Sequence, residues 1–389
     1  MQYRRSRAFF TLFLALSCLL VACSGPGAKG VTTINVALIF PLTGPNAALG
    51  LGLRNAAQLA INQANAAHSI PGVFIQTVQM DDESKPESGI EAATKAGSDQ
   101  SILAAIAHYN SPVMLATIPK YHQLNLPVIN PGSVNNHITK SGFREIVRLP
   151  TDDTFQSESA AAFAVNVLKV KNVALIDDKT NFGQSLREQF GTDVAKQGVK
   201  ILSIDSIAVG DRDFRALLTK IKASKPDLIY FGGLTTEGGL LRLQMKELGM
   251  DAYFLGSTGM WSDTFIKVAT SQAAEGTFAS GLTQPLELYP GGKAFMDAYA
   301  NAGFKEPYET FGIYGYVAGQ LVVEAIKRGG TTRAKFINAL RSIKDFSSVL
   351  GKVRIGANGQ LQPEQNWIYE VKDGKWVLYE KQPAMPSTD

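Results

Sequence analysis

The chain has 389 residues, of which 45% are hydrophobic and 19% are charged, and it carries a formal net charge of +4. This length suggests two domains with an ample hydrophobic core. Three of the positive charges lie within the first 22 residues, so the remainder is close to neutral. A nucleic-acid partner therefore has no electrostatic support.

The N-terminus has the three-part pattern of a secretory signal. Arg4, Arg5 and Arg7 precede an apolar run from Ala8 to Leu20, and small residues follow it. The run is shorter than the ~20 apolar residues that cross a bilayer. We therefore expect a cleaved signal rather than a permanent membrane helix.

The end of this run, Leu20-Val21-Ala22-Cys23, resembles the lipobox of bacterial lipoproteins. The resemblance implies that residues 1–22 are a lipoprotein signal peptide and that lipid is attached to the Cys23 thiol. The small residues of 23–32 would form a flexible tether. Such a protein lies outside the cytoplasm, anchored to the bacterial cell membrane. The alternatives are an ordinary signal with an incidental cysteine and the twin-arginine route, which Arg4-Arg5 alone would suggest.

The rest of the chain alternates short β-branched runs with amphipathic segments, a pattern typical of βα units and parallel sheets. We expect strands at residues 34–40, 73–80, 101–107, 127–130, 172–177, 200–207, 227–231 and 252–255. We expect helices at residues 52–65, 86–98, 112–124, 158–169, 183–196, 213–222, 237–248, 292–302, 307–328 and 332–342. Asp373-Gly374, between apolar runs at 366–372 and 375–380, predicts a hairpin turn.

The alternation restarts after residue 150, which favours an α/β protein with two doubly wound, parallel-sheet lobes. We expect residues 33–150 to form the first part of lobe 1 and residues 151–281 the first part of lobe 2. Residues 282–360 would return to lobe 1, and residues 361–389 would supply the C-terminal strands and tail of lobe 2.

Several motifs share an order and spacing with one family. They are Ile34 to Ala37 leading to Leu42-Thr43-Gly44-Pro45, Asp81-Asp82 with Pro86, His108 to Ser111, Val128 to Pro131, Asp177-Asp178 with Phe182-Gly183, and Tyr230 to Gly233. Over almost the whole chain after the signal, the sequence resembles the leucine-binding-protein-like solute-binding proteins of ABC transporters for branched-chain amino acids and related amides. The resemblance implies a type I periplasmic-binding-protein fold, in which two lobes joined by three crossovers close on a ligand in the cleft between them. We place the crossovers near 148–152, 281–284 and 359–365.

Ser111 is the principal candidate for an anion site. Doubly wound sheets bind ligands beyond the carboxyl ends of their strands, and Ser111 with Asn110 follows the strand expected at 101–107. Because Pro112 suits the first helical position, we expect Ser111 to be the N-cap of a helix, whose free N–H groups attract a carboxylate. The resemblance implies that the matching serine holds the ligand carboxylate. The alternative is a serine that only caps its own helix.

The resemblance also implies contacts from the loop at Gly132, Ser133 and Val134, and from the stretch that contains Thr258. Many family members carry Thr at the position of Val134, whose side chain forms no hydrogen bond. Thr258 lies where amino-acid binders carry a glutamate that pairs with the ligand ammonium. Because a buried ammonium without a carboxylate is costly, an ordinary α-amino acid would need another anion here.

Three apolar residues match positions that wall the ligand in the family: Leu49, Phe182 and Leu234. Phe182 covers the ligand from the second lobe in this interpretation, and the alternative is that it fills the core. Trp261 could belong to the same wall or to a surface loop. Since ligand sites combine apolar walls with a few polar anchors, these residues predict a largely apolar cleft.

No catalytic motif is present. The third glycine of a Gly-x-Gly-x-x-Gly loop starting at Gly50 would fall at Asn55, and the histidines are scattered rather than spaced as zinc ligands. We therefore predict a binding protein with no catalytic residue, cofactor or metal, whose partners are a small-molecule ligand, ABC permease subunits and, through lipid on Cys23, the membrane. The alternative function is the ligand-sensing module of a signalling system.

Overall fold

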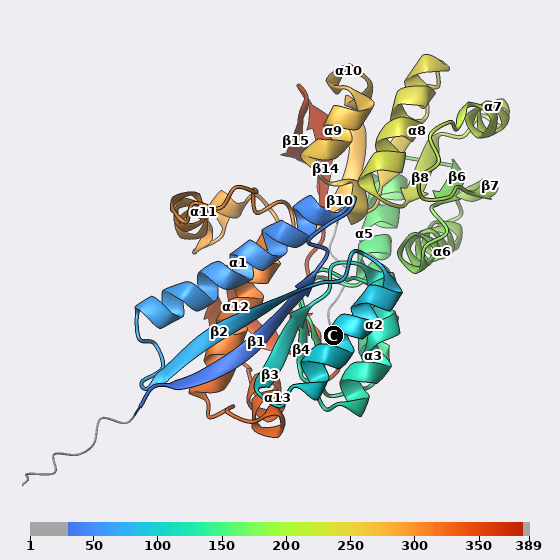
Figure 1. Ribbon diagram of the computed structural model, residues 1–389. Coiled ribbons are helices and arrows are strands. Elements are labelled where there is room, and N and C mark those ends of the chain that lie inside the picture. The colour runs from blue at the N-terminus through green and yellow to red at the C-terminus, as the bar shows by residue number, and fades with distance from the viewer. Residues whose placement is uncertain (1–29, 384–389) are drawn as a thin grey trace, which may run out of the picture.

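The computed structural model describes residues 30–383, which form two lobes, each with its own sheet (Figure 1). Lobe 1 is built on a five-stranded parallel sheet in the order β2-β1-β3-β4-β5. Its elements are β1 (Thr32–Phe40), α1 (Ala47–Ala66), β2 (Val73–Asp81), α2 (Pro86–Ser98), β3 (Ile102–Ala107), α3 (Ser111–Gln123), β4 (Val128–Asn130), α4 (His137–Lys140) and β5 (Ile146–Arg148).

Lobe 2 is built on a seven-stranded sheet in the order β15-β14-β10-β9-β8-β6-β7, in which β14 and β15 run antiparallel to their neighbours. Its first elements are α5 (Asp153–Asn166), β6 (Asn172–Asp177), α6 (Asn181–Lys196), β7 (Lys200–Ser206), α7 (Arg215–Ala223), β8 (Leu228–Gly232), α8 (Thr235–Glu247), β9 (Tyr253–Gly256), η1 (Thr258–Met260), α9 (Asp263–Ala269), α10 (Ser271–Ala274) and β10 (Thr277–Gly281). The chain returns to this sheet with β14 (Trp367–Lys372) and β15 (Lys375–Leu378).

Between β10 and β14 the chain goes back to lobe 1. This return contains η2 (Leu286–Leu288), α11 (Gly292–Asn301), α12 (Gly312–Lys327), α13 (Arg333–Arg341) and a small antiparallel sheet of β11 (Phe346–Ser348), β12 (Gly351–Ile355) and β13 (Leu361–Gln362). The chain thus passes between the lobes three times. The predicted type I periplasmic-binding-protein fold is confirmed.

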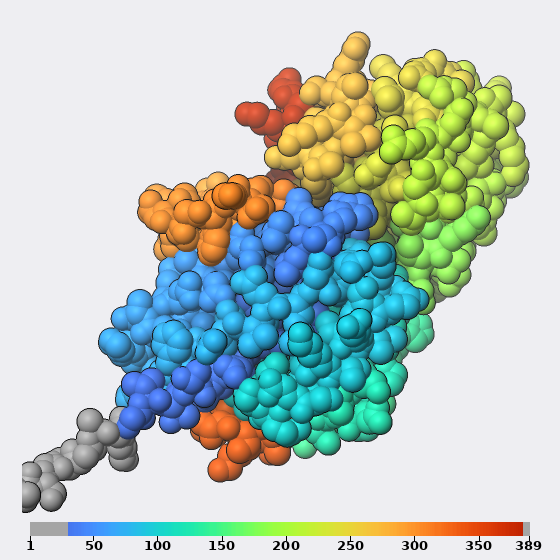
Figure 2. Space-filling view, in the orientation of Figure 1, coloured from blue at the N-terminus to red at the C-terminus, as the bar shows by residue number. Residues whose placement is uncertain are grey.

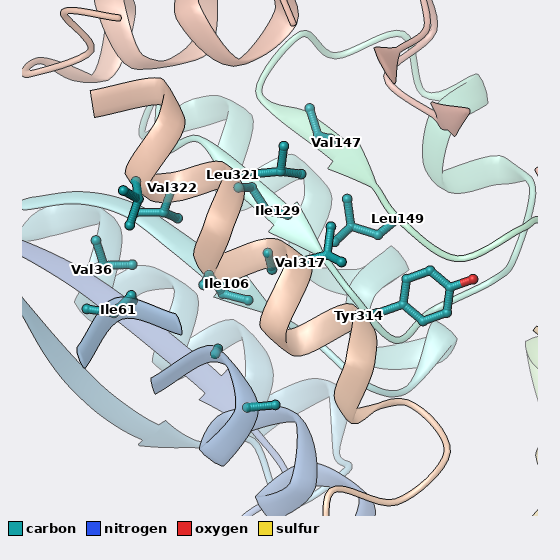
Figure 3. Packing of buried hydrophobic residues seen from close by; sticks show 14 of the residues in the cluster. Val36, Ile61, Ile106, Ile129, Val147, Leu149, Tyr314, Val317, Leu321 and Val322 are labelled. Atoms are coloured by element: carbon teal, nitrogen blue, oxygen red, sulfur yellow. The ribbon is translucent and has the colours of Figure 1, made fainter. Parts of the chain in front are cut away.

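Successive side chains of β1 point to opposite faces of the lobe 1 sheet, and helices cover both faces. Val36 and Leu38 of β1 are fully buried against α1 and α12, whereas Ala37 and Ile39 are buried on the other face with α2 and α3. Figure 3 shows α12 lying across the sheet, with Val317 and Leu321 beside Ile106 and Ile129. Helix α12, which belongs to the return of the chain from lobe 2, therefore completes the core of lobe 1.

Side chains join the first and third of the connections between the lobes. Arg148, at the end of β5, is completely buried and donates to Gln360 Oε1 (2.6 Å) and to the carbonyl oxygens of Val134 (3.1 Å) and Asn135 (2.6 Å). Its guanidinium also reaches Asp152 Oδ2 at 3.2 Å. One cation therefore ties the first and third connections to the loop after β4.

Several predicted boundaries are wrong for identifiable reasons. The helix expected from residue 307 begins at Gly312, because Glu309 has a φ of 52°, which a helix does not allow. The helix expected from residue 158 begins at Asp153, since Asp152 caps it by accepting from the Phe155 N–H at 3.0 Å. The short elements α4, β5, α9, α10, β10 and β11 to β13 were not predicted. The hairpin at Asp373-Gly374 is confirmed.

The predictions for the signal peptide and for Cys23 concern residues outside the described part of the chain. Within residues 30–383, no helix is both long enough and apolar enough to cross a membrane.

Substitution of Gly315 tests the packing of α12 on α1. A Cβ at this position would lie 2.4 Å from the backbone oxygen of Leu53, so the two helices approach too closely for any side chain. We expect Gly315→Ala to destabilise the protein by roughly 1–3 kcal/mol, measured by urea denaturation. Gly30→Ala, where a Cβ has no atom within 4 Å, is the control and should leave the stability unchanged. Equal stabilities of the two variants would contradict this account of the helix contact.

Substitution of Arg148 tests the joint between the lobes. Arg148→Met leaves several buried oxygens without their donor, and we expect a loss of about 3 kcal/mol or more in the free energy of unfolding. Arg144→Met removes an exposed arginine just before β5, which donates to Asn338 at 3.1 Å, and should cost under about 0.5 kcal/mol. A loss for Arg148→Met no larger than that of the control would refute the proposed role.

Candidate functional site

A cavity lies between the lobes, beyond the carboxyl ends of the strands in both sheets. It contains about 410 Å³ of space free of protein atoms, part of it open to solvent. On the face of the molecule shown in Figure 2, the blue-to-cyan lobe 1 and the yellow-green lobe 2 meet directly. The lining residues are Tyr109, Asn110, Ser111, Pro112, Gly132, Val134 and Phe311 from lobe 1, and Thr180, Phe182, Leu234 and Gly259 from lobe 2.

Ser111 supplies the clearest polar anchor of the cavity. It is 3% exposed, and its Oγ accepts from the N–H groups of Val134 (3.3 Å) and Asn135 (3.4 Å). A hydroxyl can accept two hydrogen bonds and donate one, so the hydrogen of Ser111 remains available to a ligand. The structure corrects one detail: Asn110 is the N-cap, and Ser111 is the first residue of α3.

Four helices begin at the cavity. The starts of α3 and α12 lie in lobe 1 and those of α6 and α8 in lobe 2, and Asn110, Phe311, Thr180 and Leu234 are their N-cap residues. The first N–H groups of a helix have no partner within it, and its N-terminus carries a partial positive charge. The backbone therefore makes the cavity favourable for an anion without a cationic side chain.

No charged side chain of the described residues lines the cavity. Asp178 lies behind it, where the Thr180 hydroxyl donates to Asp178 Oδ1 at 2.6 Å. Burial, together with the charges of Glu237 and Asp177, raises the pKa of Asp178 to about 6. Asn110 Oδ1, a buried acceptor with no partner in the described protein, is the remaining polar atom for a ligand N–H or O–H group.

Aromatic and aliphatic side chains form the rest of the wall. Tyr109 and Phe311 pack edge to face with ring centroids 5.3 Å apart, and Phe182 and Leu234 face them from lobe 2. Gly132 permits the close approach of two loops, because a Cβ there would lie 2.7 Å from the Cα of Tyr109. The predicted apolar character of the cleft agrees with this lining.

Six of the predicted ligand-binding residues line the cavity, namely Asn110, Ser111, Gly132, Val134, Phe182 and Leu234, and three do not. Leu49 packs against the core of lobe 1. Ser133 turns inward, where its hydroxyl donates to the carbonyl of Tyr109 at 3.1 Å. Thr258 is 1% exposed with no hydrogen-bond partner for its Oγ1 in the described protein, and the adjacent Gly259 lines the cavity instead.

The sequence analysis missed five lining residues: Tyr109, Pro112, Thr180, Gly259 and Phe311. Tyr109 and Pro112 flank the predicted Asn110-Ser111 pair, and Thr180 is the N-cap of α6. All three therefore lie at strand-to-helix junctions, where ligand sites of such sheets occur, and could have been predicted from the sequence. Phe311 comes from the return to lobe 1 and is the N-cap of α12, whereas the sequence predicts it inside a helix. No group of three or more His, Cys, Asp or Glu residues within 30–383 is placed to hold a metal ion.

Comparison with known proteins agrees with this architecture. Residues 33–375 match the sequence profile of the family described as "Periplasmic binding protein". The chain belongs to this family. It is 31% identical to the Leu/Ile/Val-binding protein BraC3 of Rhizobium johnstonii over 349 residues, which cover 89% of this chain and 94% of that protein.

Solved members of the periplasmic binding protein family share the fold. The substrate-binding protein LivJ of Streptococcus pneumoniae, crystallised with isoleucine, is 25% identical with a TM-score of 0.83, covering 91% of this chain and 100% of LivJ. The leucine-binding protein LivK of Thermotoga maritima is 26% identical with a TM-score of 0.82, covering 89% of this chain and 97% of LivK. The predicted family is confirmed, and its members are solute-binding proteins rather than enzymes.

Substitution of Ser111 tests the anion anchor. Ser111→Ala removes the available donor without adding volume, and we expect about a tenfold or greater loss of affinity for the preferred carboxylate ligand, measured by isothermal titration calorimetry. Ser271→Ala, at an exposed serine of lobe 2 that does not line the cavity, is the matched control. Unchanged affinity in Ser111→Ala would rule out this residue as the anchor.

Proposed function

We propose that this protein is the extracytoplasmic solute-binding lipoprotein of an ABC importer. It captures a branched-chain amino acid or a related small carboxylate or amide between its lobes and delivers that solute to the permease. The observation that carries the proposal is a cavity with walls from both lobes, in which Ser111 has a hydrogen to donate. A ligand that touches both lobes stabilises the closed form, which the permease would then recognise.

The cavity favours a particular class of solute. The starts of four helices and the Ser111 hydroxyl suit a carboxylate, and the aromatic and aliphatic wall suits an apolar body. Within residues 30–383 no carboxylate lines the cavity to pair with an ammonium group, and Thr258 stands at the position where the family resemblance implies a glutamate. Of the proposed solutes we therefore favour carboxylates without an α-ammonium group, although relatives are named for leucine, isoleucine and valine.

The place of action follows from the N-terminal pattern. Residues 1–22 would direct export, lipid on Cys23 would anchor the protein to the bacterial cell membrane, and residues 23–32 would tether the lobes near the permease. We retain as proposals the division into residues 33–150 and 282–360 for lobe 1, and 151–281 and 361–389 for lobe 2.

A thermal-shift comparison tests the class of solute. We expect 4-methyl-2-oxopentanoate, the keto acid of leucine, to raise the unfolding midpoint more than leucine does at equal concentration. A ligand present at 100 times its Kd stabilises the native state by about 2.7 kcal/mol, and the ammonium of leucine would lose hydration without a carboxylate partner. Strong stabilisation by leucine with none by the keto acid would overturn this preference.

The thermal-shift comparison of leucine with its keto acid, repeated on variants of Thr258, tests whether a carboxylate at this position sets the preference. Thr258→Glu restores a carboxylate where the family resemblance places it, and we expect the variant to respond more to leucine, relative to the keto acid, than the natural protein does. Thr258→Val removes the same hydroxyl without adding charge and is the control. If both variants respond alike, the charge at this position does not set the preference.

A further inference from the structure

A second, larger hollow opens between the lobes beside the cavity. This groove contains about 1350 Å³ of space free of protein atoms, including space open to solvent. The groove and the cavity are lined by neighbouring residues of the same two segments. Trp261 of the groove lies two residues after Gly259 of the cavity, and Thr310 of the groove directly precedes Phe311 of the cavity. Residues 307–310 border it from lobe 1, residues 261–263, 369 and 376–378 from lobe 2, and residues 283–286 from the second connection between the lobes.

Aromatic rings form much of the groove. Trp261 and Tyr369 lie with ring centroids 4.5 Å apart, and Tyr308 and Trp376 also line the hollow. The indole N–H of Trp376 donates to the carbonyl of Ser262 at 3.0 Å, so its hydrogen bond is already made within the protein. The π faces of such rings attract cations, most strongly where several rings surround one cation.

The charges around the groove are predominantly negative. Its only charged lining residues in the described chain are Asp263 of lobe 2 and Glu309 of lobe 1. Burial raises the pKa of Glu309, and the charge of Asp263 raises it further, while Lys267 opposes the shift. Glu287 raises the pKa of both Tyr308 and Tyr369, after the larger effect of burial, so its negative charge also acts on this groove.

One polar atom of the groove has no partner in the protein. Thr310 Oγ1 is buried and makes no hydrogen bond within the described residues. Glu309 likewise makes no side-chain ion pair in residues 30–383, although it is half-buried. Because an incompletely solvated carboxylate is costly without a positive partner, these two neighbouring residues leave a place for a ligand that carries positive charge.

We propose that this groove is a second binding site, which takes a small organic cation with an alkylated ammonium group. Trp261, Tyr308, Tyr369 and Trp376 contact the alkyl groups, and Glu309 and Asp263 supply the opposite charge from the two lobes. The site does not depend on which solute occupies the cavity. Since both lobes contribute to it, an occupant would favour the closed arrangement that also encloses the cavity.

Intrinsic fluorescence tests the proposal directly, because two of the three tryptophans of the chain line the groove. Tetramethylammonium chloride, which has no carboxylate for the Ser111 cavity, is titrated into the protein at constant ionic strength, with sodium chloride as the reference. We expect a saturable change in fluorescence with tetramethylammonium only. It should persist in Trp367→Phe, whose tryptophan does not line the groove, and it should be lost or strongly reduced in Trp261→Phe.

Charge variants separate this site from general cation attraction. Glu309→Gln and Asp263→Asn should each weaken tetramethylammonium binding, Glu309→Gln by about tenfold. Asp345→Asn removes an exposed carboxylate that lines neither hollow and should leave binding unchanged. Absence of saturable binding, or equal binding in all three charge variants, would overturn the proposal. The proposal would also be overturned, in favour of a protein partner, if a lysine-rich peptide bound to the protein and tetramethylammonium did not.

Discussion

The buried guanidinium of Arg148 is the contact on which both the joint between the lobes and the site depend. Burial lowers its pKa, but the charges of Asp152, Asp153 and Glu364 oppose this shift, so the cation is held by acidic groups around the joint. Its donation to the carbonyl of Val134 orients the Val134–Asn135 peptide unit, whose N–H group donates to Ser111 Oγ at 3.4 Å. A single side chain thus connects the segments between the lobes to the loop that lines the cavity.

The cavity obtains its polarity from the backbone rather than from charged side chains. Helix starts from both lobes converge on it, while the carboxylates nearby either lie behind the wall, as Asp178 does, or line the adjoining groove, as Glu309 does. Burial raises the pKa of Tyr109, a residue of the cavity wall, and the charge of Glu309, a residue of the groove, raises it further. An anion-favouring cavity and a cation-favouring groove therefore lie side by side in one cleft.

Residue periodicity predicted much of the fold, because each βα unit has its own local pattern of buried residues. Ser111 and Phe182 could be placed at the cavity from sequence, since both follow strands of parallel sheets, where ligand sites occur. Phe311 could not, because its position depends on a long-range return of the chain and on a left-handed residue, Glu309, that delays the start of α12. The orientation of Ser133 could not be predicted either. Its loop lines the cavity as expected, but its hydroxyl donates to the carbonyl of Tyr109 and therefore points inward.

The direction of β1 has a mechanical consequence. The chain enters lobe 1 at Thr32, the amino end of the strand, whereas the cavity lies beyond the carboxyl ends, and Figure 1 shows this entry at the end of lobe 1 remote from lobe 2. An attachment upstream of this point would hold the molecule by its far end. The cavity and the segments that join the lobes would then lie on the side of lobe 1 away from that attachment.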